Sequence, residues 1–311
     1  MLQSLSYTFV VLTFNRAHLL ERLLSNLERF ARAGAEIIVV DNAATISPEA
    51  RARTPPEVIL ISAPRNLGAA GRNLGFEAAT GDIVLCLDDD VFELSADALE
   101  RLDEIFANPI VGAANFTVLG EGSTQIVNWV HHRNIEQFAN VTFETYEITE
   151  GAVAFRRSAL REVGGYPESF FLSHEGPDLA FRLMNRGWQV IYTPEVKVRH
   201  SFATEGRAPW RKYYYDTRNT LWLAARNLPI CYGLRAIAWQ IAAMLAYAVR
   251  DGYLIWWLKG VVDGLRGLPT AWGQRQVLSH DTMCKVRRID SFRPSTLYML
   301  RRRLFRRGVR M

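Results

Sequence analysis

The stretch Asp82-Ile-Val-Leu-Cys-Leu-Asp-Asp-Asp-Val91 decides the fold. Its apolar run from Ile83 to Leu87 carries no charge, which is typical of a parallel strand buried on both faces. The run ends in three adjacent carboxylates, Asp88 to Asp90. Such a cluster at the end of a buried strand is costly unless a cation neutralises it, and oxygen ligands favour magnesium, manganese or calcium. The alternative is that the acids begin a solvated loop and cap a helix near Ser95.

Three further strands precede this stretch, at residues 7–13, 36–41 and 57–61. Residues 18–30 carry leucines and a phenylalanine at helical spacing, and a second helix follows the glycine-rich residues 66–73. This alternation predicts an α/β fold with a mostly parallel sheet flanked by helices. In such sheets, ligands bind beyond the carboxyl ends of the strands.

Polar side chains follow several of these strands. Thr13, Asn15 and Arg16 follow the first strand, and Asp41 with Asn42 follows the second. Taken singly, each is explained as a turn former, a cap or a surface charge. Because the carboxyl ends of parallel strands share one edge, we expect these groups and the three aspartates to converge on one crevice.

The segment Asn66-Leu-Gly-Ala-Ala-Gly-Arg-Asn73 places glycines and an arginine at the amino end of a helix. Backbone amides, the helix dipole and the guanidinium of Arg72 can together hold a diphosphate. The glycine spacing matches neither a P-loop nor the dinucleotide fingerprint, which disfavours ATPases and NAD-dependent dehydrogenases. Tight packing of a helix start against the sheet is the alternative explanation.

Four motifs, Thr13-Phe-Asn-Arg16, Val40-Asp-Asn42, residues 66–73 and Leu87-Asp-Asp-Asp-Val91, resemble family 2 glycosyltransferases with the GT-A fold, of the rhamnosyl- and galactofuranosyltransferase kind. The resemblance spans about the first two hundred residues. It implies an inverting transferase that uses a UDP-, dTDP- or GDP-linked sugar and a divalent Mn²⁺ or Mg²⁺. The residues implied for the nucleotide sugar are Thr13, Asn15, Arg16, Asp41, Asn66, Gly68, Arg72, Asp88 and Asp89, and those for the metal are Asp88, Asp90 and His200.

Within these sets the resemblance implies separate roles. Asp41 would contact the nucleoside base, Asp88 the ribose or the metal side, and Asp90 the metal, with His200 as its third ligand. Asp89 is expected to point away. Imidazole and carboxylates together suit manganese.

The stretch from Phe170 to Leu183 is similar to the acidic motif of the same family. An inverting transfer needs a carboxylate that takes the proton of the acceptor hydroxyl, and Glu175 and Asp178 are the candidates. The family's pattern has two adjacent acids, but Gly176 stands in the place of the second. We therefore expect Glu175 to be the base and Asp178 to cap the helix and orient its neighbours. The alternative is that both are acids favoured by the helix dipole.

Residues 109–155 are predicted to contain strands near 111–118 and 141–155, joined by a segment that shapes the acceptor pocket. This segment contains His131 and His132, which are either metal ligands or, more often for adjacent residues of an extended chain, ordinary surface groups. The residues after His200, through Trp210-Arg-Lys-Tyr-Tyr-Tyr215 and Arg218-Asn219, are expected to form a lid that brings cations to the phosphates.

The remaining chain is aromatic and arginine-rich. The sequence divides into a catalytic domain, 1–205, with a nucleotide-sugar part, 1–108, and an acceptor and base part, 109–205, followed by a helical region, 206–311. The apolar helix at 236–249 lies between Arg235 and Arg250, which leaves it short of the roughly twenty residues that span a bilayer. Tryptophans and the arginines at 301–310 favour an anionic membrane surface over nucleic acid. Packing on the core or in a homo-oligomer remains open.

The bulk composition fits a cytosolic location. The formal net charge is +5, and the three cysteines lack any Cys-x-x-Cys spacing, which argues against a disulfide framework and for a reducing compartment. The N-terminus shows no signal-peptide pattern. We expect a cytoplasmic enzyme, peripheral on the inner face of the membrane, that glycosylates a saccharide or a lipid-linked saccharide of the cell envelope. The alternatives are an inactive sugar-nucleotide-binding scaffold and a magnesium-dependent phosphoryl or nucleotidyl transferase.

Overall fold

The computed structural model describes residues 5–201 and 208–294. Its strands are β1 (Tyr7–Thr13), β2 (Glu36–Asp41), β3 (Val58–Ser62), β4 (Ile83–Asp88), β5 (Val91–Phe92), β6 (Val111–Gly120), β7 (Phe143–Glu144), β8 (Ala152–Arg156) and β9 (Gln189–His200). Its helices are α1 (Ala17–Arg32), α2 (Pro48–Ala52), α3 (Arg72–Ala78), α4 (Ala98–Phe106), α5 (Ile135–Phe138), α6 (Arg157–Val163), α7 (Glu175–Asn185), α8 (Trp210–Asn227), α9 (Ile230–Asp251), α10 (Leu254–Gly273) and α11 (His280–Asp290), with short 3₁₀ turns η1 (Gly68–Gly71) and η2 (Glu168–Phe170).

The strands of the described ranges form one sheet in the order β3-β2-β1-β4-β8-β6-β9-β5, with β7 paired to β9. The neighbouring strands β3, β2, β1 and β4 are parallel to one another. Strand β8 runs antiparallel to both of its neighbours, β4 and β6. The predicted α/β fold is confirmed, with a mixed sheet beyond β4. The carboxyl ends of β1, β2 and β4 point to the same edge, which gathers the polar residues that follow them.

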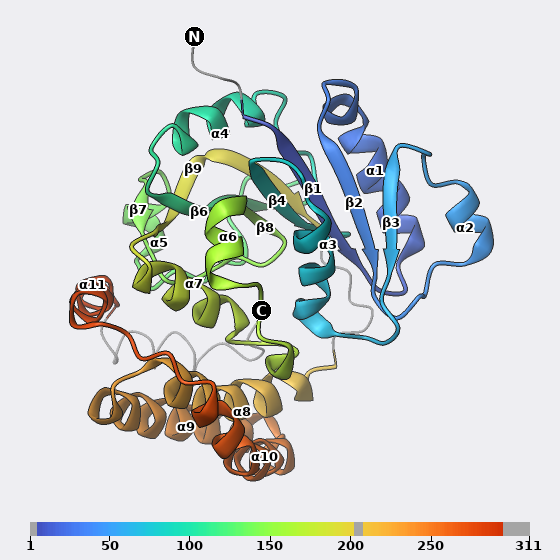
Figure 1. Ribbon diagram of the computed structural model, residues 1–311. Helices are drawn as coiled ribbons and strands as arrows, with labels where there is room; N and C mark the ends of the chain where they lie inside the picture. The colour runs from blue at the N-terminus through green and yellow to red at the C-terminus, as the bar shows by residue number, and fades with distance from the viewer. Residues whose placement is uncertain (1–4, 202–207, 295–311) are drawn as a thin grey trace.

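Two apolar layers hold the sheet between helices (Figure 1). On one face, Leu23 and Leu27 of α1 and Leu102 of α4 pack against inward side chains of the strands. On the other face, α3, α6 and α7 do the same, and α11 adds Met283. Because both faces are covered, β1, β2 and β4 read as continuous apolar runs, and burial of each large side chain contributes about 1.5–3 kcal/mol.

The predicted long strand at 141–155 is wrong in its middle. Phe143 and Glu144 pair with the outer strand β9, whereas Ala152 to Arg156 lie between β4 and β6. The chain between them crosses from one position in the sheet to the other, so residues 145–151 are not in a strand. Alternation of apolar residues cannot reveal such a crossing, because both ends satisfy it.

Helices α8, α9 and α10 lie together beside α7, apart from the sheet (Figure 1). The apolar helix predicted at 236–249 is longer than expected, since α9 continues through Arg235 and Arg250 and has 22 residues. Of the helices in the described residues, α9 alone is long and apolar enough to cross a membrane, judged by length and composition. Only 17% of its most apolar window is buried.

Residues 210–219 of the predicted lid lie in a helix. Residues 210–227 form α8, which packs closely against α10 and α9. Residues 202–207 and the arginine tail at 301–310 lie outside the described residues.

Candidate active site

The three aspartates at the end of β4 all form ion pairs, and Asp89 and Asp90 share Arg16. Asp88, the last residue of β4, forms an ion pair with Arg72, the buried first residue of α3. This contact joins the acidic cluster to the glycine-rich segment 66–73. It brings together two groups that the sequence assigned to the nucleotide.

Asp89 turns into the protein. Its carboxylate accepts a hydrogen bond from Oγ1 of Thr13 at 2.8 Å and pairs with Nη1 of Arg16 at 3.1 Å. Burial raises the pKa of Asp89 to about 6, although the positive charge of Arg16 opposes the change. Asp89 therefore ties the end of β1 to the end of β4, and the expectation that it points away from the metal position stays a prediction.

Asp90 meets His200 across the site. Oδ1 of Asp90 lies 3.2 Å from Nε2 of His200, and its Oδ2 lies 3.0 Å from Nη1 of Arg16. The pairing of β5 with β9 sets this contact, because Val91 is in register with His200. Both side chains are buried.

The donor set suits a divalent metal that is shared with a substrate. Asp90 and His200 offer one carboxylate and one imidazole at the same point. Within residues 5–201 and 208–294, no three His, Cys, Asp or Glu side chains cluster as a metal site. Mn²⁺ and Mg²⁺ commonly complete their coordination with phosphate oxygens and water, so a site with few protein ligands fits a metal that binds together with a diphosphate.

Asp41 at the end of β2 is fully buried and already holds a turn. Its oxygens accept hydrogen bonds from the backbone N–H groups of Thr45 at 2.7 Å and Ile46 at 3.1 Å, and Arg51 lies 3.4 Å away. The backbone N–H of Asn15 donates to Oγ1 of Thr45 at 2.8 Å. Asp41 therefore shapes the loop at the edge where a nucleoside base would lie.

Asn42 fixes the glycine-rich segment. Its Nδ2 donates to Oδ1 of Asn66 at 3.0 Å, and its Oδ1 accepts from the N–H of Leu67 at 2.8 Å. Gly68 has a φ of +61°, and a Cβ there would lie 2.0 Å from the carbonyl oxygen of Phe171. Glycine is required at this position for both its backbone angle and its close approach.

Glu175 begins α7 beneath this segment. Its side chain is almost fully buried, and its Oε2 has no hydrogen-bond partner in the described part of the chain. Burial raises the pKa of Glu175 to about 7, and Arg72 partly offsets the rise. A carboxylate that titrates near neutral pH is suited to general-base chemistry.

The loop before α7 is held in an unusual conformation. Phe171, Ser173 and His174 all have positive φ angles between 62° and 75°. Asn219 of α8 donates from Nδ2 to the carbonyls of Phe170, Leu172 and Ser173. The helical region therefore positions the amino end of α7.

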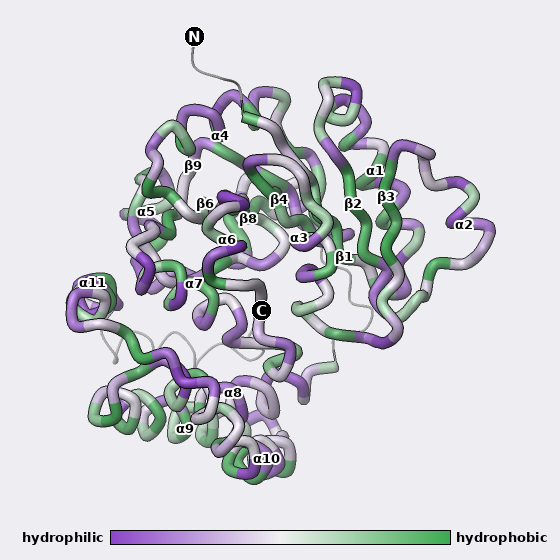
Figure 2. Tube along the Cα trace, in the orientation of Figure 1, coloured by the Kyte–Doolittle hydropathy of each residue, from purple (hydrophilic) through white to green (hydrophobic). Residues whose placement is uncertain are grey.

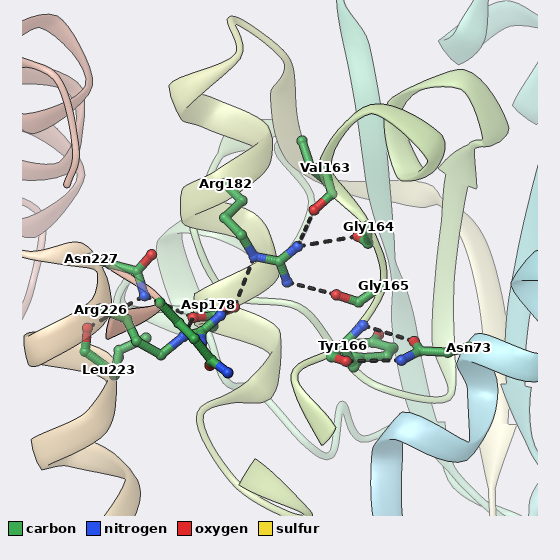
Figure 3. Close-up of polar contacts among 11 residues, drawn as sticks. Asn73, Val163, Gly164, Gly165, Tyr166, Asp178, Arg182, Leu223, Arg226 and Asn227 are labelled. Atoms are coloured by element: carbon green, nitrogen blue, oxygen red, sulfur yellow. Dashed lines mark hydrogen bonds and ion pairs between the residues drawn. The ribbon is translucent and has the colours of Figure 1, made fainter. Parts of the chain in front are cut away.

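Asp178 lies in a buried ion-pair network (Figure 3). It accepts hydrogen bonds from Nε of Arg182, Nε of Arg226 and Nδ2 of Asn227, each at 2.8 Å. Burial acts to raise the pKa of Asp178, but the two guanidinium groups outweigh it and lower the pKa. Arg182 also donates to the carbonyl of Gly165 (Figure 3). Asp178 thus joins α7 to α8, which is a different arrangement from a helix cap.

The neighbouring histidines form no joint site. His131 is buried among aromatic rings, including those of Trp129 and Tyr192, and burial lowers its pKa to about 3. His132 pairs with Glu147 at 2.5 Å. The surface explanation of His131 is therefore wrong, because its ring is buried against aromatic side chains.

The sequence analysis missed two residues of the site. Asn219 lies in the middle of α8, and nothing in its spacing indicates three carbonyl contacts. Glu150 begins the small-residue segment before β8, and its carboxyl lies close to Gly176 of α7. Gly176, in the place of the second acid, is a sequence signal for a carboxyl group supplied from elsewhere in the chain.

Comparison with known proteins finds relatives among glycosyltransferases. The chain is 30% identical over 225 residues to a pre-mycofactocin glycosyltransferase of Mycobacterium tuberculosis. The matched region covers 67% of this chain and 45% of the relative, so the chain spans about half of that protein's length. It is 26% identical over 238 residues to the N-acetylglucosaminyl-diphospho-decaprenol L-rhamnosyltransferase of the same species, which covers 64% of this chain and 78% of the relative.

A solved structure shares the fold. The mannosyltransferase from Pyrobaculum calidifontis, in complex with GDP-Man and Mn²⁺, superposes with a TM-score of 0.54 at 21% identity over 86% of this chain and 88% of the other. The model of the family described as glycosyl transferase family 2 matches residues 8–164. The chain belongs to glycosyl transferase family 2.

Proposed function

We propose that this protein is a metal-dependent, inverting glycosyltransferase that moves a sugar from a nucleotide-diphosphate sugar to a hydroxyl group of a saccharide or lipid-linked saccharide of the cell envelope. The observation that carries the proposal is the meeting of Asp90 and His200, 3.2 Å apart, next to the Asp88–Arg72 ion pair. The relatives support it: one is named as a rhamnosyltransferase for a diphospho-decaprenol compound, and the mannosyltransferase was solved with GDP-Man and Mn²⁺.

The donor lies at the carboxyl ends of β1, β2 and β4. Asp41 and Asn15 shape the edge where the base binds, and the 66–71 segment, with Gly68, approaches the diphosphate. Arg72 supplies a positive charge beside Asp88. Asp90 and His200 would hold the metal, and a bound Mn²⁺ or Mg²⁺ supplies neutralisation of the negative charge that develops on the departing diphosphate.

The transfer itself needs a base near the sugar. Glu175 takes the proton of the acceptor hydroxyl, whose oxygen attacks the anomeric carbon from the side opposite the diphosphate. The bond between the anomeric carbon and the diphosphate oxygen breaks, and its electron pair leaves with the nucleoside diphosphate. The configuration at the anomeric carbon is inverted, because a single displacement occurs.

A donor screen tests this function. The purified protein with Mn²⁺ is incubated with UDP-, GDP- and dTDP-linked sugars, and release of nucleoside diphosphate is measured with and without saccharide acceptors. Release from at least one donor, lost in Glu175→Gln but kept in Glu168→Gln, is the expected result. Glu168 is an exposed acid near α7 and serves as the matched control. Release of free nucleoside monophosphate or of pyrophosphate instead would favour phosphoryl or nucleotidyl transfer.

The C-terminal helices supply a membrane-facing surface in this proposal. Large apolar side chains of α9 and α10 are exposed. These residues are Ile230, Leu234, Trp239, Val249, Leu254, Ile255, Leu258, Val262, Leu265 and Trp272. Figure 2 shows hydrophobic stretches along both helices. An exposed apolar surface of this extent marks an interaction site, and a peripheral position on the inner face of the membrane brings the enzyme to a lipid-linked acceptor.

Liposome binding tests the membrane position. Vesicles containing phosphatidylglycerol should retain the wild-type protein, and Ile255→Glu should release it. Ile110→Glu is the matched control, since Ile110 is also exposed, at 47% against 57% for Ile255, but belongs to the turn between α4 and β6. Equal retention of the two variants, or no retention of the wild type, would contradict the proposal.

A further inference from the structure

Gly176 leaves room for a carboxyl group from another part of the chain. A Cβ at position 176 would lie 2.2 Å from Oε1 of Glu150, a distance that no real pair of such atoms adopts. On the other side, it would lie 3.1 Å from Cβ of Ile148. The carboxyl of Glu150 therefore occupies the volume that a side chain at position 176 would fill.

The two glutamates are neighbours with different exposure. Glu175 precedes Gly176 on α7 and is almost fully buried, whereas Glu150 is half-buried at the end of the crossing segment before β8. The negative charge of one carboxyl group disfavours ionisation of a second one nearby. Burial raises the pKa of Glu150 well above its usual range, and the negative charge of Glu175 raises it further.

The surrounding charges favour a pair with a single negative charge. The guanidinium of Arg72, from α3, lowers the pKa of both glutamates. Further negative charges oppose a second ionisation. The charge of Glu147 raises the pKa of Glu150, and the charges of Asp216 on α8 and Asp88 at the end of β4 raise the pKa of Glu175. One cation facing two carboxyl groups and other acids stabilises one carboxylate and leaves the other protonated.

We propose that Glu150 is a second catalytic carboxyl group of the transfer reaction, standing in the volume of a side chain at position 176 and sharing one proton with Glu175. This inference rests on the proposed function and makes the pair, rather than Glu175 alone, the base. The proton of the acceptor hydroxyl moves to the singly ionised pair. The acceptor oxygen bonds to the anomeric carbon, the diphosphate leaves with the electron pair, and the doubly protonated pair returns one proton to water.

Moving the carboxyl group back to α7 tests the role of Glu150. Glu150→Gln and Glu150→Ala should each slow sugar transfer by about 10²- to 10⁴-fold, the usual contribution of a general base, with Mn²⁺-dependent UDP, GDP or dTDP binding retained. The double variant Glu150→Ala with Gly176→Asp should transfer faster than Glu150→Ala alone, because it returns a carboxyl to the same volume. Glu168→Gln should behave as wild type. A wild-type rate in Glu150→Gln overturns the proposal.

Infrared spectroscopy tests the shared proton without any substrate. Near neutral pH, the wild-type protein should show the C=O stretch of a protonated carboxyl group, and Glu150→Gln and Glu175→Gln should each reduce that band. An unchanged band in both variants overturns the proposal whatever the transfer rates are. If the wild-type protein releases nucleoside diphosphate from no donor, the proposed function fails, and the infrared result still decides whether the two glutamates share a proton.

Discussion

Replacement of Asp178 by asparagine should unfold this protein more easily without acting on the chemistry directly. Asp178 is fully buried, and its carboxylate faces Nε of Arg182 and of Arg226, each at 2.8 Å. Asparagine keeps the shape but removes the charge, so two nearly buried guanidinium groups lose their counter-charge. Breaking a buried ion pair by removing one partner costs about 3–5 kcal/mol, which is a large share of the roughly 5–15 kcal/mol that stabilises a typical protein.

The assay is urea unfolding followed by tryptophan fluorescence at fixed salt. The matched control is Glu28→Gln, which breaks the ion pair between Glu28 and Arg32. Like Asp178 and Arg182, these two residues are four positions apart on one helix, but their side chains are 54% and 76% exposed. An exposed pair of this kind contributes only about 0.3–0.5 kcal/mol. The difference between wild type and Asp178→Asn should narrow on acidification, because the contribution of a carboxyl with a lowered pKa is lost as the pH falls through that pKa.

Two outcomes would refute this reasoning. If Asp178→Asn costs no more than Glu28→Gln, the network does not stabilise the junction of α7 and α8. If the variant is as stable as wild type but has lost transfer, Asp178 acts in the chemistry, as the acidic motif by itself suggested, and its role as a positioning residue is wrong.

Three further predictions concern the site itself. Gly68→Ala should lower the free energy of unfolding by more than about 1 kcal/mol, measured by urea unfolding, because φ is +61° and the new Cβ meets the carbonyl of Phe171; unchanged stability would contradict it. His200→Ala should weaken Mn²⁺-dependent nucleotide binding by at least the roughly 10- to 100-fold that loss of an outer-shell partner costs, measured by calorimetry, and equal affinity would count against a metal role. Burial raises the pKa of Glu175 from 4.5 to about 7, so the folded protein favours the neutral form of this side chain. The free energy of unfolding should therefore fall by about 3 kcal/mol as the pH rises from about 4.5 through 7, and Glu175→Gln should remove this change. Over the same pH range kcat/KM should rise, because the ionised form is the base.

The sequence predicted the first half of the sheet and the gathering of its strand ends well. Apolar runs such as Ile83–Leu87 predict parallel strands that helices cover on both faces. The parallel pairing of these strands then places Thr13, Asp41 and Asp88 at one edge of the sheet. The meeting of Asp90 with His200 was anticipated only through the family resemblance. Spacing alone carries no information about two residues so far apart in the chain.

Other features depend on contacts that no local pattern encodes. Asp89 turns inward because Thr13 donates a hydrogen bond to its carboxylate and Arg16 forms an ion pair with it. Helix α9 continues through Arg235 because a long charged side chain at a helix edge can reach solvent. The relation between Glu150 and Gly176 arises where the crossing segment passes the start of α7. A glycine in an acidic motif indicates a lost group from sequence alone, and only the three-dimensional arrangement shows another carboxyl in its place.

Calorimetric titration of UDP, GDP and dTDP, with and without Mn²⁺, tests the central claim most directly. The account predicts that at least one nucleotide binds to the wild-type protein far more tightly with Mn²⁺, and that Asp90→Asn abolishes this gain. Asp97→Asn, a change at an exposed aspartate, should leave the gain unchanged. Binding that is absent for all three nucleotides, or equal with and without Mn²⁺, would contradict a metal-dependent nucleotide-sugar site at the end of β4.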